Sequence, residues 1–301
     1  HQISGLNVSS QDRKAYAYYG LFGCLTDATV KNLTVCGEIY CDESTGLSGG
    51  LAGAAVGNTV IEGCAGAVSV SAQARSTAGG LVGLCRKSDE IGYQWLDNTV
   101  RLVNCLNRGD VLIFGEDRDP FSQGTAGGLV GYSKNCVQFE NCANTGAVTG
   151  ANLAAGICGN MGSAQGDHCH PFLNNCYNSG KISGKMGAYP IYGKNHMAQQ
   201  YVTGCYTFAD CYAQTNSYVT ETTGEELTGL LGDGWSREEQ GNGGLPYPAG
   251  VRVPPYSDEL SREAAKYADL LSIPADAKVG DVFSLLTSGA KADEQVQVRF
   301  V

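Results

Sequence analysis

The chain has 301 residues, of which 42 are glycine and only 8 are proline, and charged residues make up 17% of it. Abundant glycine without proline and without a three-residue period argues against collagen and against a proline-rich disordered linker. The formal net charge of −10, with no dense cluster of Lys or Arg, argues against a nucleic-acid or anionic-lipid surface, and no apolar run is long enough to span a membrane. Because residue 1 is not Met, we expect a soluble piece of a longer protein, with no membrane insertion in this segment.

A Gly-apolar-x-Gly element recurs from residue 20 onwards. Its copies are Gly20–Gly23, Gly50–Gly53, Gly80–Gly83, Gly128–Gly131 and Gly156–Gly159, with a degenerate copy at Pro190–Gly193. The copies start at intervals of 30, 30, 48, 28 and 34 residues. The sequence is therefore a repeat of about thirty residues with additions in the third and fifth units.

A second element, Asn-Cys-x-Asn-x-Gly, follows the first one in each unit. Its clear copies are Asn104–Gly109, Asn141–Gly146 and Asn175–Gly180, with weaker copies at Gly63–Gly66 and Gly204–Tyr206. A short alternating stretch comes next, such as Ala147–Gly150. Short alternating runs punctuated by Gly and Asn predict strands and turns rather than helices.

About three short strands in each unit, repeated along the chain, predict parallel pairing between equivalent strands of successive units. The predicted fold class is all-β, a right-handed parallel β-helix (β-solenoid) of about six to seven coils. Gly and Asn at the corners are expected to supply positive φ, and Gly to allow close approach of backbones.

The 13 cysteines are an odd number, and five of them recur at one position of the repeat. Cys64, Cys105, Cys142, Cys176 and Cys205 occupy it, while Leu33 takes it in the first unit. We expect small apolar side chains stacked inside the fold. Disulfides between neighbours stay open as an alternative, since the spacing permits them although parallel Cβ vectors make their geometry poor.

The Gly-Leu-Phe-Gly, Gly-Leu-Ala-Gly and Gly-Leu-Val-Gly elements, each followed by an Asn-Cys-type element, resemble the GLUG-motif repeat family of bacterial surface and secreted proteins. The resemblance covers about residues 1–215. It implies a β-helical stalk or display surface on a bacterial cell, of the kind found in adhesin-like proteins, and it implies no catalytic residue.

The rest of the chain has a different character. Residues 225–249 look like a closing segment after the last repeat, so we assign 1–249 to the solenoid domain. Residues 250–301 are assigned to a small α+β segment, with a helix predicted from Ser257 and a strand over Gln295–Val301. This segment is either a cap on the solenoid or the start of a further module.

Two insertions follow Gly-apolar-x-Gly elements and are expected to leave the fold on one side. They cover residues 85–98 and 161–171. Aromatic rings flanked by polar groups suit stacking on sugar rings, which predicts a glycan or protein partner. The alternative is that the rings pack their own loop against the coil. The candidate ligand-binding residues are Tyr93, Trp95, Asp97, His168 and His170.

These insertions, and a further one over residues 115–124, are the places where metal or acid chemistry could occur. Asp167-His168-Cys169-His170 lacks the paired spacing of a structural zinc site, so no metal and no cofactor are predicted. Paired carboxylates can perform acid/base chemistry on polysaccharides. Residues available for such an enzyme are Asp89, Glu90, Asp97 and Asp117.

The residues and the resemblance together predict a non-catalytic extracellular or cell-surface scaffold of a bacterium, adhesin-like and monomeric. Its expected partner is a glycan or a surface protein of a host or bacterium, bound through the corner loops. The alternative is a β-helical polysaccharide lyase or glycoside hydrolase, which would need carboxylates about 5–10 Å apart across neighbouring units.

Overall fold

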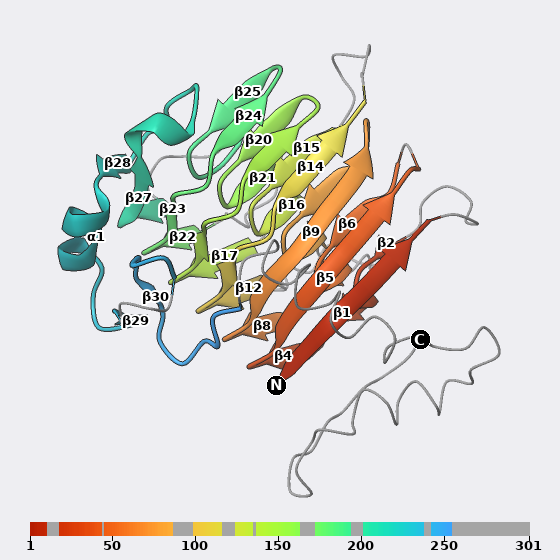
Figure 1. Ribbon diagram of the computed structural model, residues 1–301, viewed down its shortest axis with the longest axis horizontal. Helices are drawn as coiled ribbons and strands as arrows, with labels where there is room; N and C mark the ends of the chain where they lie inside the picture. The colour runs from red at the N-terminus through yellow and green to blue at the C-terminus, as the bar shows by residue number, and fades with distance from the viewer. Residues whose placement is uncertain are drawn as a thin grey trace, which may run out of the picture. The chain divides into compact units, whose positions relative to one another are not determined.

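Short strands follow one another along the chain, and each pairs in parallel with the equivalent strands of the units before and after it (Figure 1). The computed structural model describes residues 1–10, 18–43, 45–86, 99–115, 124–134, 137–162, 172–193, 201–237 and 242–254, all within the unit His1–Leu260. The predicted α+β segment 250–301 lies outside the described residues from 255 onwards.

Four parallel sheets, here named A to D, contain nearly all of the described strands. Sheet A holds β1 (Gln2–Ser9), β5 (Thr34–Cys41), β9 (Ala65–Gln73), β13 (Leu106–Asn107), β14 (Val111–Phe114), β18 (Ala143–Asn144), β19 (Val148–Gly150), β23 (Tyr177–Asn178), β24 (Ile182–Gly184), β27 (Cys205–Phe208) and β28 (Val219–Thr222). Sheet B holds β2 (Tyr18–Tyr19), β6 (Leu47–Gly49), β10 (Thr77–Gly79), β15 (Thr125–Gly127), β20 (Leu153–Ala155) and β25 (Gly187–Tyr189).

The other two sheets are built in the same way. Sheet C holds β3 (Phe22–Thr26), β7 (Ala52–Val56), β11 (Val82–Arg86), β16 (Val130–Lys134) and β21 (Cys158–Gly162). Sheet D holds β4 (Thr29–Lys31), β8 (Val60–Glu62), β12 (Val100–Val103), β17 (Val137–Glu140), β22 (Phe172–Asn174) and β26 (Val202–Thr203). The expectation of an all-β fold with parallel strands is confirmed.

Successive units visit the sheets in the order A, B, C, D, so the expectation of about three strands per unit is wrong. The strand with the weakest signal in the sequence is the one in sheet B. In β10 and β15 it reads Thr-Ala-Gly, which has no long apolar side chain to mark it as a strand. Its register is nevertheless regular, with Ala78 opposite Ala126.

The first glycine of each Gly-apolar-x-Gly element lies where the backbones of adjacent units approach. A Cβ on Gly80 would lie 2.2 Å from the Gly128 carbonyl oxygen, and a Cβ on Gly128 would lie 2.0 Å from that of Gly156. Neither Gly80 nor Gly128 has a positive φ. These glycines are therefore required by space, which confirms the expected close approach of backbones, whereas the positive φ expected at corners occurs elsewhere. The apolar residue that follows is buried, as in Leu81 and Leu129.

Positive φ occurs instead at the first residue of the Asn-Cys-type element. Asn104, Asn141 and Asn175 have φ of 52°, 51° and 54°, and Gly63 and Gly204 at the equivalent position have φ of 63° and 57°. Asn and Gly are the residues that best tolerate this left-handed conformation. The corner role predicted for Asn is confirmed at this position.

At the edge of the last unit, a side chain takes the hydrogen-bonding place of a further strand. Beyond β27 come a short 3-10 helix (Ala209–Cys211) and β28. Between them, Asn216 accepts hydrogen bonds at Oδ1 from the backbone N–H of Ile191 (3.0 Å) and Tyr192 (3.1 Å), and its Nδ2 donates to the Tyr192 carbonyl oxygen (2.8 Å). Polar groups of this edge are thus satisfied without another strand.

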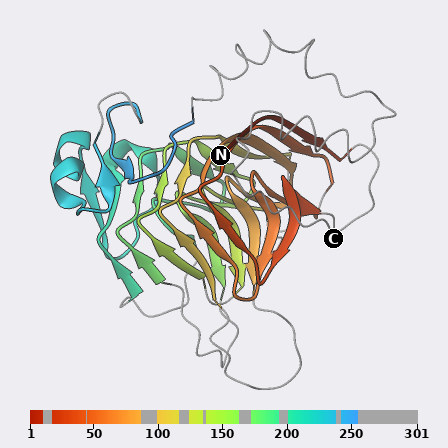
Figure 2. The ribbon, with the colours of Figure 1, turned by 90° about the horizontal axis from the view of Figure 1, so that it is seen from below.

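After β28 the chain turns back along the molecule. Helix α1 (Gly224–Leu230) opens with a capping box formed by Thr223 and Glu226. Strands β29 (Trp235–Ser236) and β30 (Tyr247–Pro248) then pair antiparallel. We call residues 224–237 and 242–254 the strap. Figures 1 and 2 show its blue end lying beside the yellow and orange strands, far from the units that precede it in the chain.

Candidate binding surface

The residues predicted to bind a ligand, Tyr93, Trp95, Asp97, His168 and His170, lie outside the described residues. So do the candidate acids Asp89, Glu90 and Asp117. The chain enters both insertions from sheet C, after β11 and β21, and leaves them into sheet D, at β12 and β22. The grouping of their side chains on one side stays a prediction.

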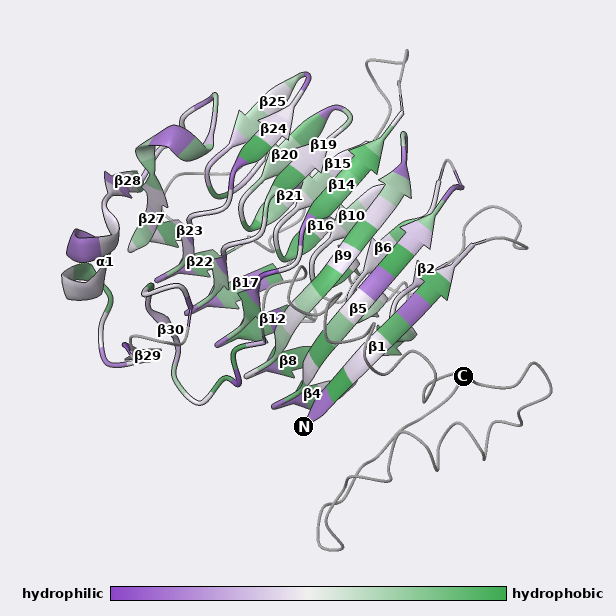
Figure 3. Cartoon of the chain, in the orientation of Figure 1, coloured by the Kyte–Doolittle hydropathy of each residue, from purple (hydrophilic) through white to green (hydrophobic). Residues whose placement is uncertain are grey.

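Within the described residues, the outer face of sheet A carries the most distinctive surface. Alternate residues of its strands point inwards and outwards, and in Figure 3 the long strands β1, β5 and β9 show alternating apolar and polar bands. On β9 the inward residues Val68, Val70 and Ala72 belong to the main core, whereas Ser69 and Ser71 are only partly buried. In the next unit, two short strands take the place of a single long strand in this sheet. Strand β13 pairs with the start of β9, and β14 pairs with its end.

The first half of this outer face is covered by the strap, and we call it the covered half. In the covered half, each unit contributes one outward side chain to a row, and this row is mainly apolar. They join the strap in a second hydrophobic cluster consisting of Ala65, Leu106, Ala143, Tyr177, Leu227, Leu231, Trp235, Tyr247 and Val251.

Polar contacts hold the strap at two places along its length. The Tyr177 hydroxyl donates to the Pro246 carbonyl oxygen (2.5 Å) and accepts from Asn242 Nδ2 (2.9 Å), and the ring of Trp235 lies 5.3 Å from that of Tyr177. Further along, Thr34 Oγ1 donates to the Arg252 carbonyl oxygen (3.0 Å). Burial under this cover raises the pKa of the Cys36 thiol to about 11.

The second half of the outer face is not covered by the strap, and we call it the open half. One row crosses it in register from β1 to β24: Ser9, Tyr40, Ser71, Leu112, Thr149 and Ser183. Four of these six side chains are the short hydroxyl-bearing Ser or Thr, and the other two are the large Tyr40, with an apolar ring and a phenolic hydroxyl, and the apolar Leu112. Tyr40 is 46% exposed and Leu112 is 40% exposed.

A pair of aromatic rings occupies the middle of the open half. The rings of Tyr40 on β5 and Phe114 on β14 have centroids 5.6 Å apart and planes inclined by only 8°. The two strands are separated by β9, where Ser71 and Gln73 lie opposite Tyr40 and Phe114. The rings therefore stack across a strand with smaller polar side chains, within the usual range for stacked aromatic pairs.

Charges around the ring pair are of both signs. Glu38, Asp42 and Asp110 are exposed on the strands that carry the rings or next to them, and Arg75 and Lys181 are exposed towards the ends of β9 and β24. Asp110 Oδ1 accepts a hydrogen bond from the Ala147 backbone N–H (2.8 Å). The surface thus concentrates neither sign of charge.

The cysteine column forms part of the interior. Cys64, Cys105, Cys142, Cys176 and Cys205 are all buried. Eleven of the 13 cysteines lie in the described residues, and none of the eleven is in a disulfide. The expectation of stacked small side chains is confirmed for the column, and the alternative of disulfides within it is wrong.

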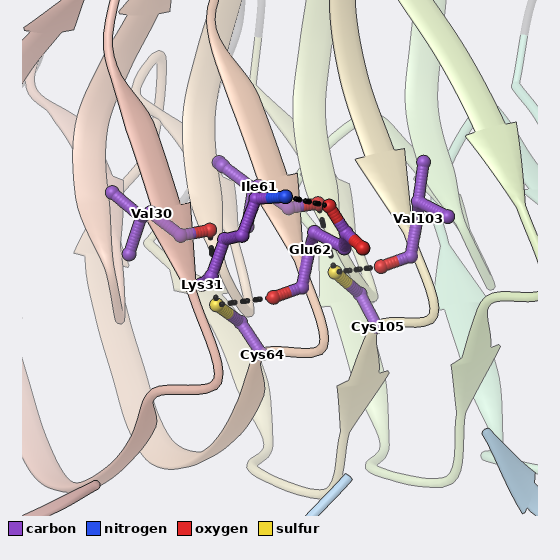
Figure 4. Close-up of polar contacts among 7 residues, drawn as sticks. All are labelled: Val30, Lys31, Ile61, Glu62, Cys64, Val103 and Cys105. Atoms are coloured by element: carbon purple, nitrogen blue, oxygen red, sulfur yellow. Dashed lines mark hydrogen bonds and ion pairs between the residues drawn. The ribbon is translucent and has the colours of Figure 1, made fainter. Parts of the chain in front are cut away.

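Each thiol of the column donates to backbone carbonyl oxygens (Figure 4). Cys64 Sγ lies 3.4 Å from the Glu62 oxygen and 3.6 Å from that of Val30, and Cys105 Sγ lies 3.3 Å from the Val103 oxygen. Loss of hydration on burial raises the pKa of Cys64 to about 12 and that of Cys105 well above its ordinary value. A thiol kept protonated in this way is a poor nucleophile and a poor metal ligand.

No set of three or more His, Cys, Asp or Glu side chains is placed to hold a metal ion among the described residues. In the same part of the chain, no helix is both long enough and apolar enough to cross a membrane.

No protein-family model matches the chain, and no curated protein sequence matches it. A solved structure from Bacteroides ovatus, described as that of a "putative immunoglobulin A1 protease", is similar to it over 83% of this chain and 75% of that chain. The TM-score is 0.51 and the sequence identity is 17%. At this identity the likeness concerns the fold alone. The strand pairing of this chain gives that fold a parallel β-rich architecture.

Proposed function

We propose that this chain is a non-catalytic display domain of a bacterial surface or secreted protein, adhesin-like and monomeric. In this proposal the four sheets form a right-handed parallel β-helix of about six to seven coils, of the type that the GLUG-motif resemblance implies. The fixed order of the sheets in successive units supports the β-helix. Its handedness follows from the strong preference of parallel crossover connections for the right-handed form.

The single observation that carries the display function is the outer face of sheet A. It is a continuous lateral surface to which every unit contributes a strand, and half of it is not covered by the strap. Repeat proteins commonly use such extended surfaces for binding. An exposed group of large apolar side chains such as Tyr40 and Leu112 is a frequent mark of a binding site.

The alternative of a polysaccharide lyase or glycoside hydrolase gains no support from the described residues, since its candidate acids lie outside them. The name of the Bacteroides ovatus protein refers to a protease, but 17% identity transfers no activity to this chain. We therefore propose the display function alone.

Two measurements test it. Antibodies raised against the purified chain should label intact cells of the bacterium that produces the protein, or the protein should be recovered from its medium. Labelling that needs permeabilised cells, with none of the protein in the medium, would overturn the extracellular assignment. Incubation with a panel of polysaccharides should release neither reducing ends nor unsaturated products, and release of either would establish the enzyme instead.

A further inference from the structure

We propose that the open half of sheet A is a binding platform for a neutral glycan, with Tyr40 and Phe114 as its aromatic centre. This inference rests on the display function proposed above and names its ligand class and its site. The site differs from the corner insertions, where Tyr93 and Trp95 were predicted to bind.

A ligand on the platform would contact side chains and not backbone groups. Strands β5, β9, β14 and β19 each have a paired strand on both sides, so their N–H and C=O groups are used within the sheet. A peptide that binds by adding a strand needs an open edge, and these four strands around the ring pair have none. A ligand here must therefore be recognised by rings and hydroxyls.

The two halves of the same face differ in the chemistry that they present. Where the strap, a polypeptide segment, is bound, the outward residues are mainly apolar, as in Leu106 and Ala143. The equivalent row of the open half has Ser or Thr at four of its six positions, with Tyr40 and Leu112 at the other two. A sugar ring matches this mixture, because it has apolar C–H faces for an aromatic ring and hydroxyls around its rim.

The distribution of charge selects among glycans. Sulfated or uronic-acid chains would meet the carboxylates of Glu38, Asp42 and Asp110, and among the described residues the basic Arg75 and Lys181 lie on different strands and form no cluster to compensate them. Like charges brought together at an interface weaken binding. Exposed carboxylates can instead accept hydrogen bonds from sugar hydroxyls. The favoured ligand is thus an uncharged oligosaccharide or polysaccharide.

The test uses the full chain on an array of neutral and anionic glycans, followed by titration with the strongest neutral glycan found. Binding should occur on neutral glycans, and Tyr40→Ser should weaken it by about tenfold or more, since exposed aromatic anchors dominate such sites. Tyr40→Phe should retain most of the affinity because the ring is preserved. Leu230→Ser is the matched control, because Leu230 is 47% exposed but lies on α1, in the strap.

Three results would overturn this inference. They are the absence of binding to every neutral glycan, binding to anionic glycans only, and binding that Tyr40→Ser leaves unchanged while circular dichroism shows every variant folded. None of them affects the cell-labelling test, so the platform can fail while the display function stands. Labelling confined to permeabilised cells would remove the display function without altering the array result.

Discussion

The two asparagines of the Asn-Cys-x-Asn-x-Gly element have different roles. The first adopts the left-handed conformation at the corner, as Asn141 does with φ of 51°. The second points inwards: Asn107, Asn144 and Asn178 are fully buried, and each Nδ2 donates to the carbonyl oxygen of the glycine two residues later at 2.7–2.8 Å. The sequence predicts turns for both, since it cannot tell a buried amide ladder from a surface turn.

Breaking that ladder should be costly. In Asn144→Ala the Asn107 amide, the Gly146 carbonyl and the Asn178 Oδ1 each lose a partner at 2.8 Å. Buried groups without partners cost about 1–3 kcal/mol each, so we expect a loss of roughly 3 kcal/mol or more in the free energy of unfolding. Urea unfolding measures it. Ser183→Ala, at an exposed position on β24 of the same sheet, should change it by less than about 0.5 kcal/mol.

A pair of glycine substitutions separates the two reasons for using glycine. Gly128→Ala would place a Cβ 2.0 Å from the Gly156 carbonyl oxygen, so adjacent units would have to move apart. We expect a loss of about 2 kcal/mol or more, or failure to fold. Gly229→Ala, in α1 with nothing within 4 Å of the new Cβ, should be neutral or stabilise by up to about 1 kcal/mol. Equal effects in thermal melts of the two variants would refute the steric argument.

At the scale of elements, the strap makes contacts between residues that are far apart in the sequence. Thr34 and Arg252, joined by a hydrogen bond, are 218 residues apart. Trp235 is only 6% exposed and packs beside Tyr177, which anchors the strap to β23. The strap therefore ties units near the two ends of sheet A together.

Truncation of this anchor should loosen the strap. Trp235→Ala removes a large buried side chain, at a cost of about 3–5 kcal/mol. The backbone at Arg252 should then open more often, so trypsin should cut after this exposed residue faster than in the unmodified chain. Leu230→Ala, at a 47% exposed position of α1, should leave the cleavage rate unchanged. A strap that stays equally resistant in Trp235→Ala is held by its polar contacts alone.

At the scale of the whole molecule, the buried thiols link stability to pH. Burial raises the pKa of Cys64 and Cys158 to about 12 and those of Cys105, Cys142 and Cys176 well above the ordinary value. Thiols of an unfolded chain lose their protons above about pH 8.5. The folded chain then binds more protons than the unfolded one, so stability is complete below that pH and falls as the pH rises.

The expected decline is about 1.4 kcal/mol per pH unit for each such thiol between about pH 9 and pH 11. Urea unfolding in the presence of a reductant, at several pH values across this range, gives the slope. Other groups also titrate here, so Cys142→Ala is the control, and its slope should be smaller by the contribution of one thiol. An identical slope would show that Cys142 is not protonated by burial.

The amino-acid sequence by itself determined the repeat, the parallel strands and the buried cysteine column, because these depend on side chains that recur at a fixed period and meet their own equivalents in the next unit. Only the tertiary structure decided that each unit has a fourth strand, that the strap lies on sheet A, and that Tyr40 meets Phe114 on its open half. Outward alternation in Glu38–Cys41 and Val111–Phe114 was a signal for exposed rings. The stacking of the two rings depended on the register between units of unequal length, which no local pattern encodes. The position of the strap depended on contacts that do not recur with the repeat.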